Sequence, residues 1–164
     1  MDFLDISLIF SILSCSLVTG LIFTYAIVVL PGFSKLDDKE YLRAFQVTDE
    51  VIQNNQPLFM LTWIGSIISV LGAILASILS PELAKTWFVV LIGAVYLIGV
   101  QGITITIHLP MNNHIKDLNL DELDDQTLSK ERLKLETKWN YFNNIRTGVG
   151  FFVSLSLLLI LTLR

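Results

Sequence analysis

Four long stretches without a charged residue divide this chain of 164 amino acids. They cover residues 6–30, 51–81, 86–107 and 147–163, and are 25, 31, 22 and 17 positions long. A helix of about 20 residues crosses the hydrocarbon of a bilayer. Lipid offers no partners for backbone N–H and C=O groups, so such segments must be helical. The pattern predicts an all-α fold built as a four-transmembrane-helix bundle.

The composition agrees with one integral membrane domain. Hydrophobic residues make up 53% of the chain and charged residues 16%, against about 25% charged in ordinary soluble domains. Spans at about 6–30, 57–80, 86–108 and 147–163, with their connections, use the whole of residues 1–164 as a single domain. We therefore expect membrane lipids as partners. The net charge of −4, without a basic patch, argues against nucleic-acid binding.

The basic residues predict an orientation. Nine Lys and Arg residues lie in the connections after the first helix and before the fourth, whereas only Lys85 and Arg164 lie on the opposite side. Cytoplasmic loops collect Lys and Arg, so both long connections are predicted to be cytoplasmic and both termini outside. We expect a multi-pass protein of the bacterial inner (plasma) membrane.

The connection after the first helix predicts an interfacial amphipathic helix. Pro31-Gly32 is expected to end the first helix, and Ser34 and Asp37 offer caps for a new one. Residues recurring at steps of four and three form one stripe: Tyr41, Phe45, Thr48, Ile52 and Asn55. The acidic residues are expected mostly off it: Asp38, Glu40, Asp49 and Glu50. Such a helix lies flat on the membrane or packs over the bundle mouth.

The last connection predicts a cytosolic extension of helix 4. Five acidic residues between Asp117 and Asp125 indicate a solvated loop. From about Leu128 the sequence favours a helix that continues into the fourth span, because neither Pro nor Gly interrupts it before Gly148.

Polar residues gather at the four helix ends that this topology places on one face. Both histidines and nearly all the amides lie there, including Asn54, His108, Asn112, Asn113, His114, Asn143 and, with them, Trp139 and Arg146. Charged groups at such depth tend to face the bundle interior. This concentration is the main functional clue.

Helical spacing predicts a shared pocket. Trp139, Asn143 and Arg146 are spaced four and three and point the same way. Gln101, Thr104 and His108 are spaced three and four, which makes one polar line. The predicted pocket is lined by His108, Asn112, Trp139, Asn143 and Arg146, with Gln101 at its base.

Each of these residues also has a structural interpretation. Arg146 could anchor lipid phosphates, Trp139 could belong to the aromatic belt, and His108 could be a hydrogen-bonded core residue. Gln101 could bond across helices, and the amides before Pro57 could cap the second helix. A metal site is disfavoured, because His108 and His114 have no third strong ligand at a matching spacing.

Two elements carry a resemblance to a known family. They are Pro-Met-Asn at 110–112, within Thr-Ile-His-Leu-Pro-Met-Asn-Asn, and the Trp…Asn…Arg run at 139–146. With Leu30-Pro31-Gly32 and Pro57, their order resembles the anthrone-oxygenase-like family of small four-helix membrane proteins, over nearly the full chain. Members with known activity oxidise anthrones to anthraquinones with molecular oxygen and no evident cofactor.

The resemblance implies roles for the pocket residues. His108 would be the base that removes a carbon-bound proton. Arg146, Asn112 and Asn143 would stabilise the resulting oxyanion, and Trp139 would offer a flat face to a hydrophobic small molecule. No cofactor is expected. Two alternatives stay open: a non-catalytic membrane binding or accessory protein, and a small transporter, which is the weakest because the spans lack midplane charges.

Overall fold

The computed structural model describes residues 2–80 and 83–163, and the regular elements in these ranges are helical. Four helices in this part are long and apolar enough to cross a membrane: Phe3–Phe33, Pro57–Ile78, Thr86–Lys116 and Asp125–Leu163. Large apolar side chains on their outer faces are exposed, among them Leu61, Ile68 and Ile98. These faces contact lipid. The predicted four-helix membrane fold is confirmed.

The first spanning helix continues past the predicted break at Pro31. It consists of α1 (Phe3–Thr24), the π-helical turn η1 (Tyr25–Val29) and α2 (Leu30–Phe33). A proline ring collides with the carbonyl group four residues earlier, here that of Ile27. The helix widens at this point, with the Leu30 N–H bonded to the Tyr25 carbonyl oxygen, and so accommodates the ring. The helix then ends at Phe33, one residue after the predicted Pro31-Gly32 break, with Ser34 as its C-cap.

The third spanning helix follows the same rule at Pro110. It runs through α5 (Leu83–Tyr96), η2 (Leu97–Gly102), η3 (Thr104–His108) and α6 (Leu109–Lys116). The Leu109 N–H bonds the Thr104 carbonyl oxygen, again just before a proline. The wide turns change which side chains face the bundle in the segment that carries Gln101, Thr104 and His108.

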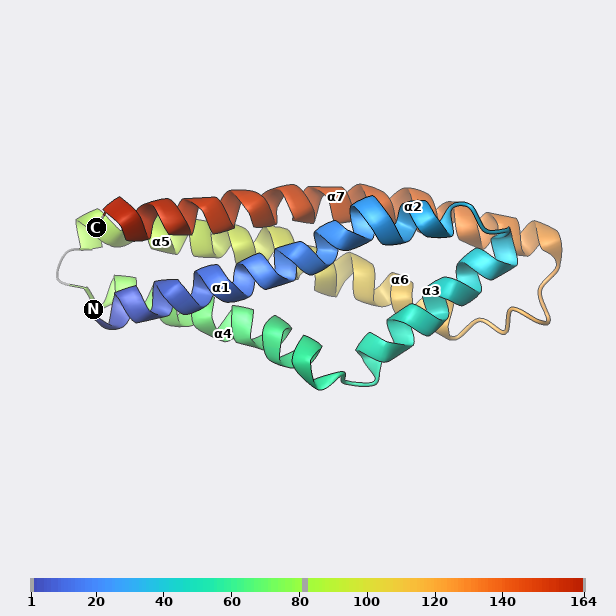
Figure 1. Cartoon of the computed structure of the whole chain (residues 1–164), viewed down its shortest axis with the longest axis horizontal. Helices are drawn as coiled ribbons and strands as arrows, with labels where there is room; N and C mark the ends of the chain where they lie inside the picture. The colour runs from blue at the N-terminus through green and yellow to red at the C-terminus, as the bar shows by residue number, and fades with distance from the viewer. Residues whose placement is uncertain (1, 81–82, 164) are drawn as a thin grey trace.

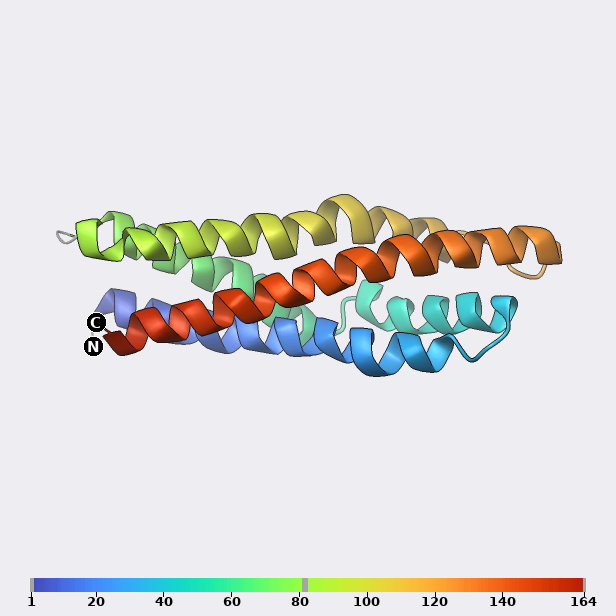
Figure 2. The same cartoon turned by 90° about the horizontal axis from the view of Figure 1, so that it is seen from above.

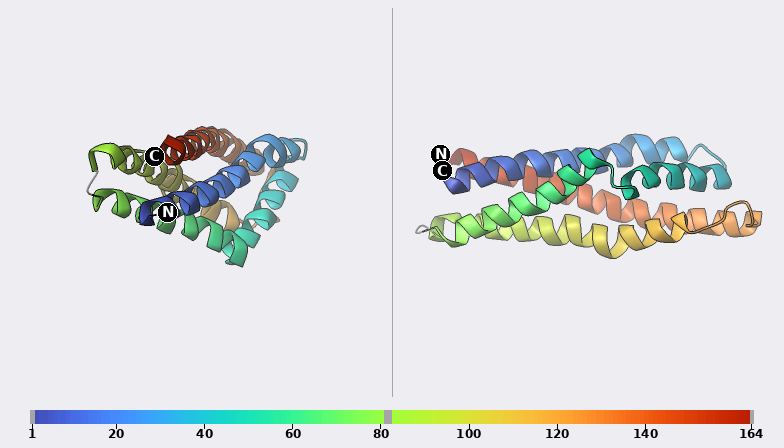
Figure 3. Two further views of the ribbon diagram at one scale, coloured as in Figure 1. Left: turned by 60° about the vertical axis from the view of Figure 1, so that its left-hand side comes forward. Right: turned by 90° about the horizontal axis from the view of Figure 1, so that it is seen from below.

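Helix α3 (Asp38–Gln53) begins where the sequence predicts a cap. The Asp37 carboxylate accepts a hydrogen bond from the Glu40 backbone N–H at 2.8 Å. Its buried residues are Tyr41, Leu42, Phe45 and Asp49. The buried face is thus rotated from the predicted stripe toward Leu42 and Asp49, because α3 folds back along α2 and packs on α6 and α7 (Figure 3). The prediction that Asp49 lies off the buried stripe is wrong.

Helix α4 (Pro57–Ile78) starts after a sharp turn. Asn55 has a φ of 59°, a left-handed conformation that an asparagine tolerates. The Gln56 side chain accepts a hydrogen bond from the Phe59 backbone N–H, and Pro57 occupies the first turn. The capping interpretation of these amides is confirmed for Gln56.

Helix α7 (Asp125–Leu163) runs the whole length of the molecule (Figure 2). Its 39 residues span about 58 Å at about 1.5 Å per residue, roughly twice the hydrocarbon thickness. The Thr127 N–H donates to the Asp124 carboxylate at 2.7 Å, so the helix begins slightly before the predicted Leu128. The predicted extension of the fourth helix is present.

Both long connections lie at one end of the molecule, and the two chain ends lie at the other (Figure 1). This arrangement places the polar helix ends of the four spans on one side, as the topology predicts. Of the two basic residues expected at the opposite end, Arg164 and the side chain of Lys85 lie outside the described residues. Which end faces the cytoplasm stays a prediction.

The buried residues form two separate cores. One core belongs to the membrane bundle, made by α1, α4, α5 and the C-terminal half of α7, and includes Leu8, Val70, Tyr96 and Val153. The other belongs to an outer layer, made by α2, α3, α6 and the N-terminal half of α7, and includes Tyr41, Leu42, Ile115 and Leu135. The candidate site lies where these two layers meet.

Candidate active site

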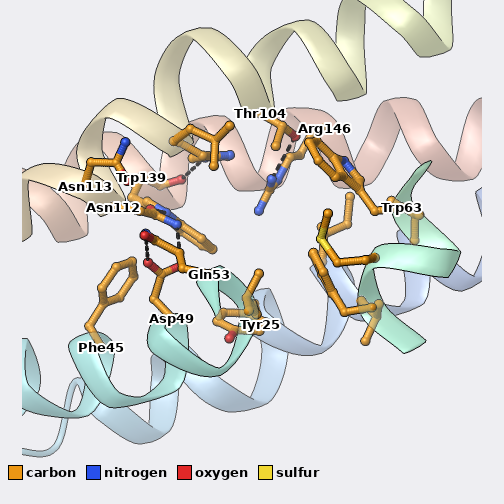
Figure 4. Close-up of a pocket in the computed structure, with 18 of the residues that line it drawn as sticks. Tyr25, Phe45, Asp49, Gln53, Trp63, Thr104, Asn112, Asn113, Trp139 and Arg146 are labelled. Atoms are coloured by element: carbon orange, nitrogen blue, oxygen red, sulfur yellow. Dashed lines mark hydrogen bonds between the residues drawn. The ribbon is translucent and has the colours of Figure 1, made fainter. Parts of the chain in front are cut away.

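A cavity of about 300 Å³ lies at the junction of the outer layer and the membrane bundle (Figure 4). All four spanning helices and α3 contribute to its wall. Aromatic rings make up much of this wall: Tyr25, Phe45, Phe59, Trp63 and Trp139. The volume falls at the lower end of the range for small-molecule sites, about 300–1,000 Å³. The cavity has the size and apolar walls that suit a flat hydrophobic ligand.

Arg146 brings a buried positive charge to this cavity. Its side chain is only 7% exposed, and its Nε and Nη2 donate to Asn143 Oδ1 at 3.0 and 2.9 Å. Its Nη1 donates to Thr104 Oγ1 at 3.1 Å. Among residues 2–80 and 83–163, no carboxylate lies within 4.0 Å of the guanidinium. The hydrogen-bond partners of this cation are neutral oxygens, so a ligand oxyanion would complete its environment.

His108 lies against Trp139 in the cavity wall. The side chain is 1% exposed, and its ring centroid lies 4.6 Å from that of Trp139. Its Nε2 lies 3.3 Å from the Trp139 carbonyl oxygen, which can only accept a hydrogen bond. The hydrogen of the neutral ring therefore belongs on Nε2, and Nδ1 carries the lone pair. Nδ1 has no hydrogen-bond partner within the described ranges.

The side chain of Trp139 contacts both Arg146 and His108. The Arg146 guanidinium carbon lies 5.2 Å from the centroid of its ring, a cation–π distance. Its indole Nε1 donates to Asn112 Oδ1 at 3.0 Å, which fixes the ring plane. Tyr25 and Phe45 pack against it with centroids 5.8 Å away in each case. The Trp139 ring therefore contacts both the guanidinium of Arg146 and the imidazole of His108.

Asp49 is a buried acid in the same cavity that the sequence reasoning missed. Its side chain is 6% exposed, Oδ1 accepts from Asn112 Nδ2 at 2.7 Å, and Oδ2 accepts from Gln53 Nε2. Burial raises the pKa of this carboxyl, although the bonds from Gln53 and Asn112 and the charge of Lys116 oppose the rise. Its spacing of four from Phe45 and eight from Tyr41 was the signal that could have placed it on the buried face.

The structure brings most of the predicted site residues together. Five of them line the cavity: His108, Asn112, Asn113, Trp139 and Arg146. Asn143 lies behind the wall with 0% exposure, where its Nδ2 donates to the Ile22 carbonyl oxygen at 3.1 Å. Both ends of its amide are occupied, so it positions Arg146 instead of facing a ligand directly.

Gln101 also supports the wall from behind. Its Oε1 accepts a hydrogen bond from Trp63 Nε1 at 2.6 Å, and its Nε2 donates to the hydroxyl oxygens of Tyr96 and Ser66. These bonds join α4 to the third spanning helix, so the interpretation of Gln101 as a residue that bonds across helices is confirmed. Through Trp63 the same bonds fix one wall of the cavity.

Asn54 does not reach the cavity. It is exposed at the end of α3, where its Nδ2 lies 3.4 Å from Glu50 Oε1, whereas its neighbour Asn55 lines the cavity. His114 is also outside, paired with Glu131 at 2.8 Å. In the described part of the chain, no group of three His, Cys, Asp or Glu side chains is arranged to hold a metal ion.

These features define a class: an integral membrane protein of four helices, with an aromatic cavity and a buried cation at one end of its spans. The comparison with known families is consistent with this class. The sequence model of the anthrone oxygenase family matches residues 54–156, which include His108, Trp139 and Arg146. The chain belongs to this family. No match was found among curated proteins or among solved structures.

Proposed function

We propose that this protein is a cofactor-independent oxygenase that acts on a hydrophobic, anthrone-like small molecule. It would work in the bacterial inner membrane, with both long connections in the cytoplasm and both termini outside. Membership in the anthrone oxygenase family supports this proposal. So does the cavity at the end of the spans, whose wall contains five aromatic side chains.

The proposal depends mainly on the position of the Arg146 guanidinium. It is buried, it lines the cavity, and no carboxylate in the described ranges neutralises it. A buried charge of this kind is unfavourable without an ion partner. The same charge favours catalysis when a ligand develops negative charge on an oxygen atom. A prearranged donor in a site without bulk water stabilises that oxyanion strongly.

The chemistry requires a base, an oxyanion site and O₂. Once the His108 ring turns its buried Nδ1 toward the cavity, that nitrogen takes one proton from the CH₂ group of the substrate. The electron pair moves to the keto oxygen beside Arg146. The enolate transfers one electron to O₂, the carbon radical and superoxide combine, and the imidazolium returns its proton to give a hydroperoxide. The second hydrogen on that carbon leaves as a proton while the O–O bond breaks and hydroxide departs. The products are a carbonyl group and water.

Trp139 and Trp63 supply the shape of the site. Both rings are fixed by hydrogen bonds from their indole nitrogens, to Asn112 and Gln101 respectively. A flat fused-ring ligand between aromatic walls places its reacting carbon at a defined distance from the imidazole. Holding the reactants in this way removes an entropic part of the barrier.

The test is turnover by the purified protein in lipid nanodiscs. Anthrone would be supplied with O₂, and both O₂ uptake and anthraquinone absorbance would be followed, with protein-free nanodiscs as the background. Loss of a general base lowers rates by about 100-fold to 10,000-fold, and loss of an oxyanion donor by about 100-fold to 1,000-fold. We expect His108→Asn and Arg146→Gln to fall within these ranges.

The chain offers matched controls for both variants. His114→Asn changes the other histidine, which lies outside the cavity, and Arg43→Gln changes an exposed arginine paired with Asp121. Both controls should retain wild-type turnover. Full activity in His108→Asn would refute the base role, and a wild-type rate equal to the background would refute the proposed function.

A further inference from the structure

Asp49 and Arg146 reach into one cavity from facing helices, α3 and α7 (Figure 4). They carry opposite charges, yet they do not form an ion pair, because no nitrogen–oxygen distance between them is within 4.0 Å. The cavity therefore has a positive side and a negative side separated by space. Two buried charges kept apart in this way predict a ligand that contacts both.

The carboxylate of Asp49 can accept more hydrogen bonds than it does in this structure. An ionised carboxylate offers about four lone-pair sites. Asn112 Nδ2 and Gln53 Nε2 occupy one on each oxygen. Lys116, the cation whose charge acts on Asp49, donates its own bond to Gln53 Oε1 at 3.1 Å and lies outside the cavity. A buried acceptor with free lone pairs gains most from a donor that enters the cavity.

The surroundings of Asp49 restrict what that donor can be. The walls beside it are the rings of Phe45 and Tyr25, and Trp139 is joined to it through Asn112. A hydrated cation does not suit such apolar walls, whereas a hydroxyl group at the edge of an aromatic ring does. Asp49 lies outside residues 54–156, so the match to the family model gives no information about it.

We propose that Asp49 is a ligand-contacting residue that accepts a hydrogen bond from a ring hydroxyl at the end of the ligand opposite Arg146. It thereby selects flat aromatic ketones that carry a free hydroxyl group over analogues that lack one. The inference rests on the proposed function for the class of ligand. Its test uses quinones, which are already oxidised, so that binding is measured without turnover.

The experiment measures binding in nanodiscs by the quenching of tryptophan fluorescence, since Trp63 and Trp139 line the cavity. The probes are anthraquinone, 2-hydroxyanthraquinone and 2-methoxyanthraquinone, at a pH where the hydroxyl is protonated. A hydroxyl at this position points away from the keto oxygens and remains free to donate. Hydrogen bonds to charged groups give about tenfold to 100-fold discrimination, so wild-type protein should prefer the hydroxyl compound to the methoxy compound by that factor.

Asp49→Asn should reduce this preference to near one while leaving the affinity for unsubstituted anthraquinone within about twofold. Glu50→Gln is the matched control, because it removes a charge from the exposed neighbouring residue. Asp49→Ala provides a second variant in case the asparagine reorients Asn112. Circular dichroism and size-exclusion chromatography would confirm that each variant is folded.

The outcomes separate this inference from the proposed function. An unchanged preference in both Asp49 variants, or no preference in the wild type, would overturn the role of Asp49. Absence of binding by all three quinones would overturn it too. A preference that depends on Asp49 without any oxidation of anthrone would uphold the inference and refute the oxygenase. Oxidation without such a preference would do the reverse.

Discussion

The membrane bundle and the outer layer are packed by different forces. Around the core of the bundle, apolar side chains are exposed and contact lipid, so burial gives little hydrophobic driving force between helices. The outer layer instead carries ion pairs on its surface, such as Lys39–Asp121 at 2.9 Å and Arg132–Asp38 at 3.1 Å. Its core is stabilised as in a soluble protein, by removing apolar groups from water.

This contrast explains why the candidate site lies at the junction. The outer layer supplies Asp49, and the bundle supplies Arg146 together with apolar wall residues such as Leu21. Neither layer alone provides the whole wall. The contrast also predicts that the two layers respond to opposite kinds of substitution.

The largest effect is expected in the outer layer, from Leu135→Ala. Leu135 is 1% exposed in that core, and such truncations cost about 2–5 kcal/mol because apolar contact is lost and a cavity remains. Hydrogen exchange of α3 should accelerate while the amides of α1 and α4 stay protected. Leu133→Ala, on a side chain that is 67% exposed, should change neither. Acceleration spread evenly over all helices would contradict a separate outer layer.

A smaller effect, of opposite kind, is expected in the membrane bundle from Gly150→Ala. A Cβ atom at position 150 would lie 3.0 Å from Thr19 Cγ2 and 3.2 Å from Thr19 Cβ, so α1 and α7 would have to separate. Thr19 cannot easily turn away, because its hydroxyl donates to the Cys15 carbonyl oxygen at 2.7 Å. Overpacking of this kind costs about 1–3 kcal/mol.

The control for this prediction is two residues away on the same helix. At Gly148 an added Cβ meets no atom within 4 Å. Gly148→Ala should therefore keep or slightly raise the midpoint of thermal unfolding in nanodiscs, whereas Gly150→Ala should lower it. Equal midpoints for the two variants would argue that close approach of α1 and α7 does not stabilise the bundle.

The sequence predicts the features that follow from solvent and spacing. The lengths of the uncharged stretches predict the four spans. The topology predicts that the polar helix ends lie on one side, where His108 and Arg146 line the same cavity. The rotation of α3 is harder to predict, because packing against α6 and α7 decides it and buries Asp49. The wide turns before Pro31 and Pro110 are not visible in periodicity either. The catalytic roles themselves stay predictions.

The smallest effect concerns the charge at the junction and depends on pH. Burial raises the pKa of Asp49 in the folded protein, so the ionised carboxylate opposes folding at neutral pH. Stability from this group therefore increases as the pH falls through the raised pKa toward the ordinary value of 3.8. Asp49→Asn should unfold at a higher temperature than the wild type at neutral pH, and the difference should close on acidification.

Other titrating groups do not obscure this comparison. The pKa of Asp121 is lowered by Lys39 and Arg43, so its contribution to stability is lost on acidification, but it is the same in both proteins and cancels in the difference. The groups near Asp49 are also shared: Lys116, Tyr25, His108 and Arg146. A lower midpoint for Asp49→Asn at neutral pH would mean that the bonds from Gln53 and Asn112 outweigh burial. A higher midpoint for Asp49→Asn, together with loss of the preference for the hydroxyl quinone, would have a clear meaning. It would indicate that the Asp49 carboxylate contributes to ligand binding and lowers the stability of the folded protein.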